Sequence, residues 1–253
     1  MNDKIKFLYS GNEYEFPLVQ GSENEVAIDI KTLRQNTGLI TLDPGYKNTG
    51  SCISDITYLD GENGILRYRG YDIADLANNS SFIEVSYLLI FGELPSKSKL
   101  QEFENDIKEE LIVHEDIKNI LKSFPTGAHP MGVLASLTSA LISFNPESVD
   151  LRSEEKMYHA IVQLMAKFSI LTAWVHRKNQ GLPINYPDIS ISYVENLSKM
   201  MFMKPNKKYS NQSLIISALN KLLILHADHE QNCSTSTVRI VGSSEAGLFA
   251  SIS

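Results

Sequence analysis

The segment Leu225-His-Ala-Asp-His-Glu-Gln-Asn-Cys-Ser-Thr-Ser-Thr-Val-Arg239 is the densest cluster of polar, chemically versatile side chains in the sequence. It follows an apolar stretch, 213–225, whose pattern predicts a helix. His226 and His229 are three positions apart, so a continuing helix would place both imidazoles on one face. The negative end of the helix dipole favours a protonated imidazole, which can donate a hydrogen bond to an anionic oxygen.

Three interpretations of these histidines remain open from the residues alone. In the first, both imidazoles satisfy buried backbone groups where the helix meets the next segment. In the second, they ligate zinc or iron together with Asp228 or Glu230. The His-Glu-x-x-His spacing is absent, however, and the other histidines show no partner motif, so no metal is assigned. In the third, they bind a small carboxylate substrate.

Residues 1–70 have the pattern of short strands and turns. Apolar and polar residues alternate from Ile5 to Tyr9, before a turn at Gly11-Asn12. A second hairpin is predicted where 53–59 meets Asp60-Gly61 and returns through 64–69. This part of the chain is therefore expected to be a small β-rich region.

Helical periodicity dominates residues 71–253. Ser81 and Glu84 form a capping-box pattern ahead of an apolar helix that ends at Gly92. Residues 246–253 begin a further apolar element. The other helices are predicted at 100–111, 117–124, 130–144, 154–176 (with a break near Ser169), 193–203 and 213–225. The expected fold is mainly α, with two regions, 1–70 and 71–253.

The composition is that of an ordinary globular protein, with 43% hydrophobic and 21% charged residues in 253. A net charge of −7 and the lack of a Lys/Arg-rich block argue against nucleic-acid or anionic-membrane partners. The charge-free segment between Lys122 and Glu147 has an apolar part about 14 residues long, too short for a span of ~20. Cys52 and Cys233 form no disulfide framework, and no signal peptide is expected, so a cytoplasmic location is predicted.

The segment 225–239 resembles the oxaloacetate-binding segment of bacterial citrate synthase. The likeness extends through nearly the whole sequence in the order of the family, at Asp43-Pro-Gly45, Ser54-Asp-Ile-Thr-Tyr-Leu-Asp-Gly61, Gly64-Ile-Leu-Arg-Tyr-Arg-Gly-Tyr-Asp72, Phe91-Gly-Glu-Leu-Pro95, His129-Pro-Met131 and Gly242-Ser-Ser244. The protein is similar to the bacterial branch that has an extra N-terminal β region. The resemblance implies the helical large domain of that fold, and a homodimer or a hexamer of dimers.

The resemblance also implies a function, that of an acyltransferase of the tricarboxylic acid cycle. Such an enzyme joins oxaloacetate to acetyl-CoA, its co-substrate, and needs no further cofactor. By the resemblance, His229 is the substrate-binding histidine, and His226 packs behind it. Asn232 and Ser234 match positions that line the oxaloacetate pocket.

Other parts of the family's machinery have no counterpart in these 253 residues. The Gly-Pro-x-His-Gly-Gly turn with the enolate-stabilising histidine is absent, so no catalytic residue is assigned. Arg239 is the only arginine after Arg177, too few to hold two carboxylates. Together with the apolar stretch at 246–253, this predicts a C-terminally truncated N-terminal portion that is inactive alone.

Two alternative functions stay open: a 2-methylcitrate synthase that uses propionyl-CoA, and a non-catalytic fragment that associates through helices such as 130–144. Glu109 and Glu110 stand where NADH-inhibited relatives carry basic and histidine residues, and carboxylates repel phosphate, so no NADH regulation is predicted. Glu245 replaces a glycine of related enzymes, which leaves the start of the last helix open.

Overall fold

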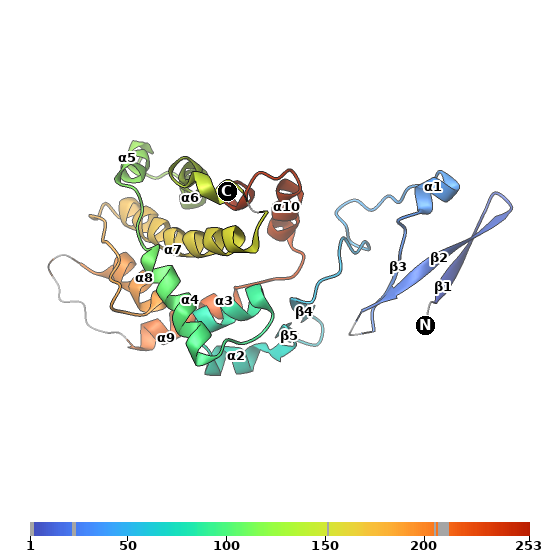
Figure 1. The fold of residues 1–253 in the computed structure, drawn as a ribbon, viewed down its shortest axis with the longest axis horizontal. Helices are drawn as coiled ribbons and strands as arrows, with labels where there is room; N and C mark the ends of the chain where they lie inside the picture. The colour runs from blue at the N-terminus through green and yellow to red at the C-terminus, as the bar shows by residue number, and fades with distance from the viewer. Residues whose placement is uncertain (1–2, 22–23, 151, 205, 207–212) are drawn as a thin grey trace. The chain divides into compact units, whose positions relative to one another are not determined.

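The structure is a computed structural model that describes residues 3–21, 24–150, 152–204, 206 and 213–253. The protein forms two compact units, Met1–Asp55 and Ile56–Ser253 (Figure 1). The sequence-based division at residue 70 follows the change from strands to helices. The contacts instead divide the polypeptide at residue 55, so the second hairpin belongs to the helical unit.

The first unit is a three-stranded antiparallel sheet in the order β1-β2-β3, followed by a short helix. The predicted hairpin forms, but its turn is Ser10-Gly11 and not Gly11-Asn12, because Asn12 already pairs with Tyr9 as the first residue of β2. Both turn residues have positive φ, 50° and 79°, as a tight hairpin with right-handed strand twist requires. The elements are β1 (Lys4–Tyr9), β2 (Asn12–Gln20), β3 (Val26–Ile28) and α1 (Leu33–Thr37).

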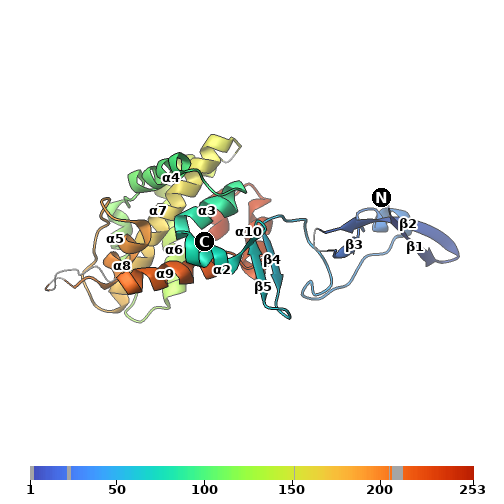
Figure 2. The same cartoon turned by 90° about the horizontal axis from the view of Figure 1, so that it is seen from below.

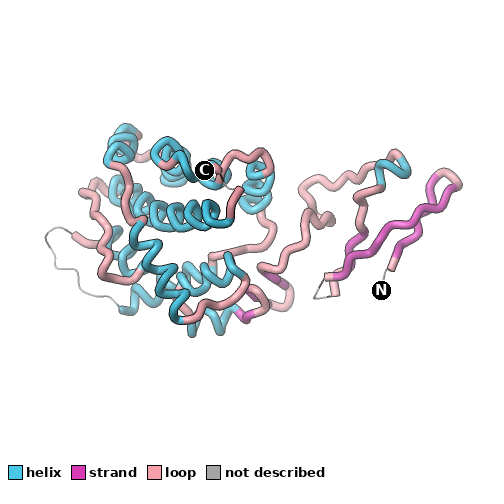
Figure 3. The backbone as a smooth tube through the Cα atoms, viewed as in Figure 1, coloured by secondary structure: helices cyan, strands magenta, loops and turns pink. Residues whose placement is uncertain are grey.

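The second unit begins with the predicted second hairpin, which Figure 3 shows as magenta strands beside the helices. β4 (Thr57–Asp60) and β5 (Ile65–Tyr68) are antiparallel, and β6 (Tyr71–Asp72) extends this sheet. Tyr68 at the end of β5 is wholly buried. It packs in a small apolar cluster with residues of three helices, namely Leu76, Val85, Leu88 and Ile224.

Helices make up the rest of this unit: α2 (Ile73–Asn79), α3 (Phe82–Phe91), α4 (Lys97–Glu109), α5 (Glu115–Ser123), α6 (Pro130–Ala140), α7 (Glu154–Asn179), α8 (Tyr193–Phe202), α9 (Ser213–Leu225), α10 (Cys233–Gly242) and α11 (Leu248–Ile252). The capping box of Ser81 and Glu84 is confirmed at the start of α3, and Gly92 ends that helix with φ 88°. Among the described residues, no helix combines the length and apolar character of a membrane span.

Helix α7 is the centre of the core. Helices α4, α6 and α8 pack against it (Figure 1 and Figure 2), and Ala166, Ile170 and Trp174 on it are almost fully buried. The predicted break near Ser169 is wrong, because the helix runs unbroken from Glu154 to Asn179. The Ser169 hydroxyl donates to the carbonyl of Ala166, so the helix itself satisfies this buried polar group.

The helix predicted over 130–144 is shorter than expected. The α-helix ends at Ala140, and residues 141–144 continue as a tighter 3₁₀ turn. Helix α11, in the apolar stretch after residue 245, packs against α6 and α7, and its Phe249 is 1% exposed.

A buried cation joins the ends of α7 and α8. Arg177 has no exposed surface, and its guanidinium donates to the carbonyls of Pro183, Met201 and Met203, the last two at 3.2 and 2.8 Å. Burial lowers the pKa of this group. These bonds satisfy carbonyls that α8 leaves open at its C-terminus.

Burial also acts on the Tyr193 hydroxyl, which donates to the Met165 carbonyl at 2.9 Å. Its pKa is raised to about 12 from an ordinary value of 10. Since Tyr193 ionises first in the unfolded polypeptide, its contribution to the free energy of unfolding is constant below pH ~10 and decreases as the pH rises toward 12. Between pH 9 and pH 11, we expect the free energy of unfolding to fall by about 1 kcal/mol less in Tyr193→Phe than in the parent, because the variant has no phenol to ionise. Urea unfolding at both pH values measures this, and equal losses would contradict it.

Glu245, between α10 and α11, adopts φ +59°, a left-handed conformation that favours glycine. We expect Glu245→Gly to raise the free energy of unfolding by about 0.5–1 kcal/mol, because it relieves this strain. Glu102→Gly, in the middle of α4, is the matched control and should lower it by about 1 kcal/mol. Thermal and urea unfolding measure both. A destabilised Glu245→Gly variant would contradict the strain argument.

Candidate functional site

The predicted site residues lie in the connection between α9 and α10, residues 226–232, and in the first turn of α10. Helix α9 ends at Leu225, so the expectation that His226 and His229 share a helical face is wrong. The helix closes with a tightened turn in which the Ala227 amide donates to the carbonyl of Ile224. The two histidines therefore take their positions from the connection and its contacts rather than from helical periodicity.

His226 is exposed and acts on the helix end. Its Nδ1 lies 2.8 Å from the carbonyl oxygen of Leu222, one of the last carbonyls of α9. An imidazole N–H that donates to such an oxygen caps the C-terminus of the helix. His226 thus contacts the end of α9.

His229 is exposed, and its imidazole forms no hydrogen bond with another residue that the structure describes. The next residue, Glu230, has φ +57°, so the backbone reverses directly after this histidine. His229 is therefore presented at a bend, with its ring available for a ligand.

The two acidic neighbours of His229 are engaged by the β4–β5 hairpin. The Thr57 hydroxyl donates to Asp228 Oδ2 at 2.5 Å, and the Leu59 amide donates to Glu230 Oε1 at 2.8 Å. The same Asp228 oxygen accepts the Glu230 amide at 3.0 Å. These contacts use the carboxylates to shape the connection. Across the described residues, no group of three or more His, Cys, Asp or Glu side chains is placed to hold a metal ion.

Asn232 begins the next helix. Its Oδ1 accepts the amide of Thr235 at 2.9 Å as the N-cap of α10, and its Nδ2 reaches the His229 carbonyl at 3.5 Å. Ser234 is exposed in the first turn of α10. All four predicted residues lie within 226–234 of the sequence, and the structure gives Asn232 a capping role that was not predicted.

Arg239 also belongs to this part of the molecule. Its Nη1 donates to Gln231 Oε1 at 3.2 Å, so the guanidinium lies against the connection. Arg239 was not predicted as a site residue, although a cation two turns after the N-cap Asn232 would have been a signal. A cation here favours an anionic ligand.

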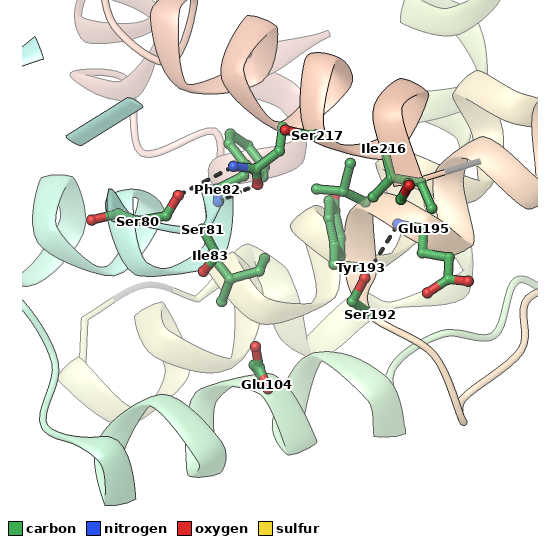
Figure 4. Close-up of a pocket in the computed structure, with 13 residues that line it drawn as sticks. Ser80, Ser81, Phe82, Ile83, Glu104, Ser192, Tyr193, Glu195, Ile216 and Ser217 are labelled. Atoms are coloured by element: carbon green, nitrogen blue, oxygen red, sulfur yellow. Dashed lines mark hydrogen bonds between the residues drawn. The ribbon is translucent and has the colours of Figure 1, made fainter. Parts of the chain in front are cut away.

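The larger of the two described cavities lies elsewhere, where α3 and α8 begin and α9 passes (Figure 4). Its volume is about 420 Å³, and its lining is rich in hydroxyls and includes Glu104 and Glu195. The described lining residues include no Lys, Arg or His, so this cavity suits a dicarboxylate anion poorly. His226, His229, Asn232 and Ser234 do not line it.

The family model described as "Citrate synthase, C-terminal domain" matches residues 45–253. Citrate synthase of Corynebacterium glutamicum is 48% identical over 251 residues, 99% of this chain and 57% of that protein. Citrate synthase 1 of Mycobacterium tuberculosis is 44% identical over 252 residues and 58% of its length. The 253 residues thus span less than two thirds of these relatives.

Solved structures of citrate synthases share this fold. Citrate synthase from Pyrobaculum aerophilum is 28% identical, with a TM-score of 0.74 over 93% of this chain and 55% of that one. The enzyme from Thermoplasma acidophilum, solved with carboxymethyl coenzyme A and oxaloacetate, is 23% identical and has a TM-score of 0.75 over 83% of this chain and 54% of its own.

The capping role of Asn232 can be separated from any role in ligand binding. We expect Asn232→Ala to lower the free energy of unfolding by about 1 kcal/mol, because the Thr235 amide loses its acceptor. Asn232→Ser keeps a capping oxygen and should stay within a few tenths of the parent. Urea unfolding measures both variants. Equal losses of unfolding free energy would show that the missing cap does not cause the destabilisation.

Proposed function

Because the chain belongs to the citrate synthase family, a family of acyltransferases, we propose that residues 225–239 form one wall of an oxaloacetate site in an enzyme that makes citrate from oxaloacetate and acetyl-CoA. The observation that carries this proposal is the exposed His229 at a bend, where the carboxylates of the two neighbouring residues accept hydrogen bonds from the β4–β5 hairpin. Acetyl-CoA is the co-substrate, and no resident cofactor is needed.

Each residue has a chemical role in this proposal. The His229 imidazole donates a hydrogen bond to an oxygen of oxaloacetate, and the Arg239 guanidinium adds positive charge beside it. The Ser234 hydroxyl and the Asn232 amide donate from the start of α10. His226 acts on the α9 carbonyl rather than on the substrate.

Condensation needs more than substrate binding. The methyl group of a thioester is a very weak acid, so its deprotonation requires a base and a group that stabilises the enolate oxygen. No histidine follows His229 in these 253 residues, and Arg239 is the only arginine after Arg177. We therefore propose that these residues alone bind oxaloacetate without turning it over.

The purified 253-residue protein should bind oxaloacetate in calorimetry and release no CoA from acetyl-CoA in a thiol assay. His229→Ala should weaken oxaloacetate binding by about tenfold or more, because it removes a hydrogen bond to a charged ligand. His159→Ala removes an exposed imidazole of α7 and serves as the matched control, with unchanged binding.

Appreciable CoA release by this protein would contradict the proposed lack of turnover. An absence of oxaloacetate binding, or equal losses in His229→Ala and His159→Ala, would contradict the proposed substrate site.

A further inference from the structure

We propose that the β4–β5 hairpin positions His229 for ligand binding by holding the residues on both sides of it, so that Thr57, Tyr68 and Glu230 are positioning residues. The identity of the ligand rests on the function proposed above. The way in which His229 is held rests on the hydrogen bonds alone.

The first anchor is the Tyr68 hydroxyl. It lies 3.1 Å from the carbonyl oxygen of Ile224 and 3.0 Å from that of Asp228, and the Asp228 amide donates to it at 3.3 Å. Tyr68 has no exposed surface, and burial raises the pKa of its hydroxyl. One buried phenol therefore ties the last turn of α9 to the residue that precedes His229.

The second anchor is the Asp228 carboxylate. Its Oδ2 accepts both the Thr57 hydroxyl and the Glu230 amide. The Glu230 amide belongs to the peptide group that follows His229, so the two peptide groups around His229 are held by one side chain, as in an Asx turn. Thr57 orients that side chain through a charge-assisted hydrogen bond.

The third anchor is Glu230. Its carboxylate accepts the Leu59 amide of β4, and its backbone is left-handed at φ +57°. A residue other than glycine keeps such a conformation only where its surroundings enforce it. The bond to Leu59 supplies that enforcement directly after His229.

Together the anchors fix the backbone on both sides of His229 while its exposed ring stays available. A ligand that meets a pre-ordered backbone has less conformational entropy to remove on binding. In an opposing explanation, Asp228 and Glu230 face the ligand themselves. The bonds from the hairpin argue against it, because one oxygen of each carboxylate already accepts from Thr57 or Leu59. Two ligand-facing carboxylates would also repel a dicarboxylate.

The 253-residue protein, labelled with ¹³C and ¹⁵N in histidine and with ¹⁵N in glutamate, tests the proposal by NMR. His229→Asn identifies the His229 imidazole signals by their loss. In Thr57→Val, which keeps the side-chain shape without the hydroxyl, we expect these signals to shift and broaden, and the Glu230 amide to exchange with solvent about tenfold faster. In Thr57→Ser both should return to the parent behaviour. The His159 signals of α7 should stay unchanged in every variant.

A second pair of variants, at Glu230, keeps the test valid if Thr57→Val fails to fold. Glu230→Gly suits the left-handed backbone but removes the acceptor for the Leu59 amide, whereas Glu230→Gln keeps an acceptor oxygen. We expect the His229 signals to change in Glu230→Gly and to stay near the parent in Glu230→Gln. Unchanged His229 signals in both Thr57→Val and Glu230→Gly would overturn the proposal, as would equal changes at His159.

Titration with oxaloacetate separates this proposal from the function on which it rests. We expect Thr57→Val to raise the dissociation constant about tenfold, and Thr57→Ser to leave it within about twofold. If the parent protein binds no oxaloacetate, the proposed function fails, while the signal changes still decide how His229 is held. If oxaloacetate binds equally to both Thr57 variants, the positioning role is overturned and the binding function stands.

Discussion

Burial of α7 is the constraint on which the helical unit depends. This helix carries fully buried residues along its length, and it packs against α4, α6 and α8 at once. The C-terminal end of α7 is also held by hydrogen bonds, because Arg177 donates to the carbonyls of Met201 and Met203 at the C-terminus of α8. Since a buried guanidinium without partners is costly, these bonds favour the contact between the C-terminal ends of the two helices.

The site is linked to this framework through the hairpin. Tyr68 packs with Leu76, Val85, Leu88 and Ile224, so β5, α2, α3 and α9 share one small apolar cluster. Its hydroxyl reaches out of that cluster to the connection that carries His229. Apolar burial therefore sets where the connection lies, and a few polar bonds set its shape. The hairpin thus explains how a connection with no regular secondary structure of its own becomes ordered.

Much of the fold could be predicted from local patterns. The two hairpins, the capping box at Ser81 and the limits of α9 follow from residues close together in the sequence, and the structure has them. The predicted break near Ser169 does not occur, because the Ser169 hydroxyl bonds within the helix and leaves the backbone hydrogen bonds intact. The prediction that His226 and His229 share a helical face was wrong for another reason. The bonds that shape their connection come from Thr57, Leu59 and Tyr68, and no local pattern contains partners that distant.

The hydrogen bond between Thr57 and Asp228 joins residues separated by 171 positions, nearly the full length of the helical unit. Contacts of such high sequence separation form late in folding, because the polypeptide between them must first become compact. During synthesis the hairpin leaves the ribosome long before its partner segment does. We therefore expect the region around His229 to be among the last to acquire its native geometry, so that the order of its ring reports on completion of the whole unit.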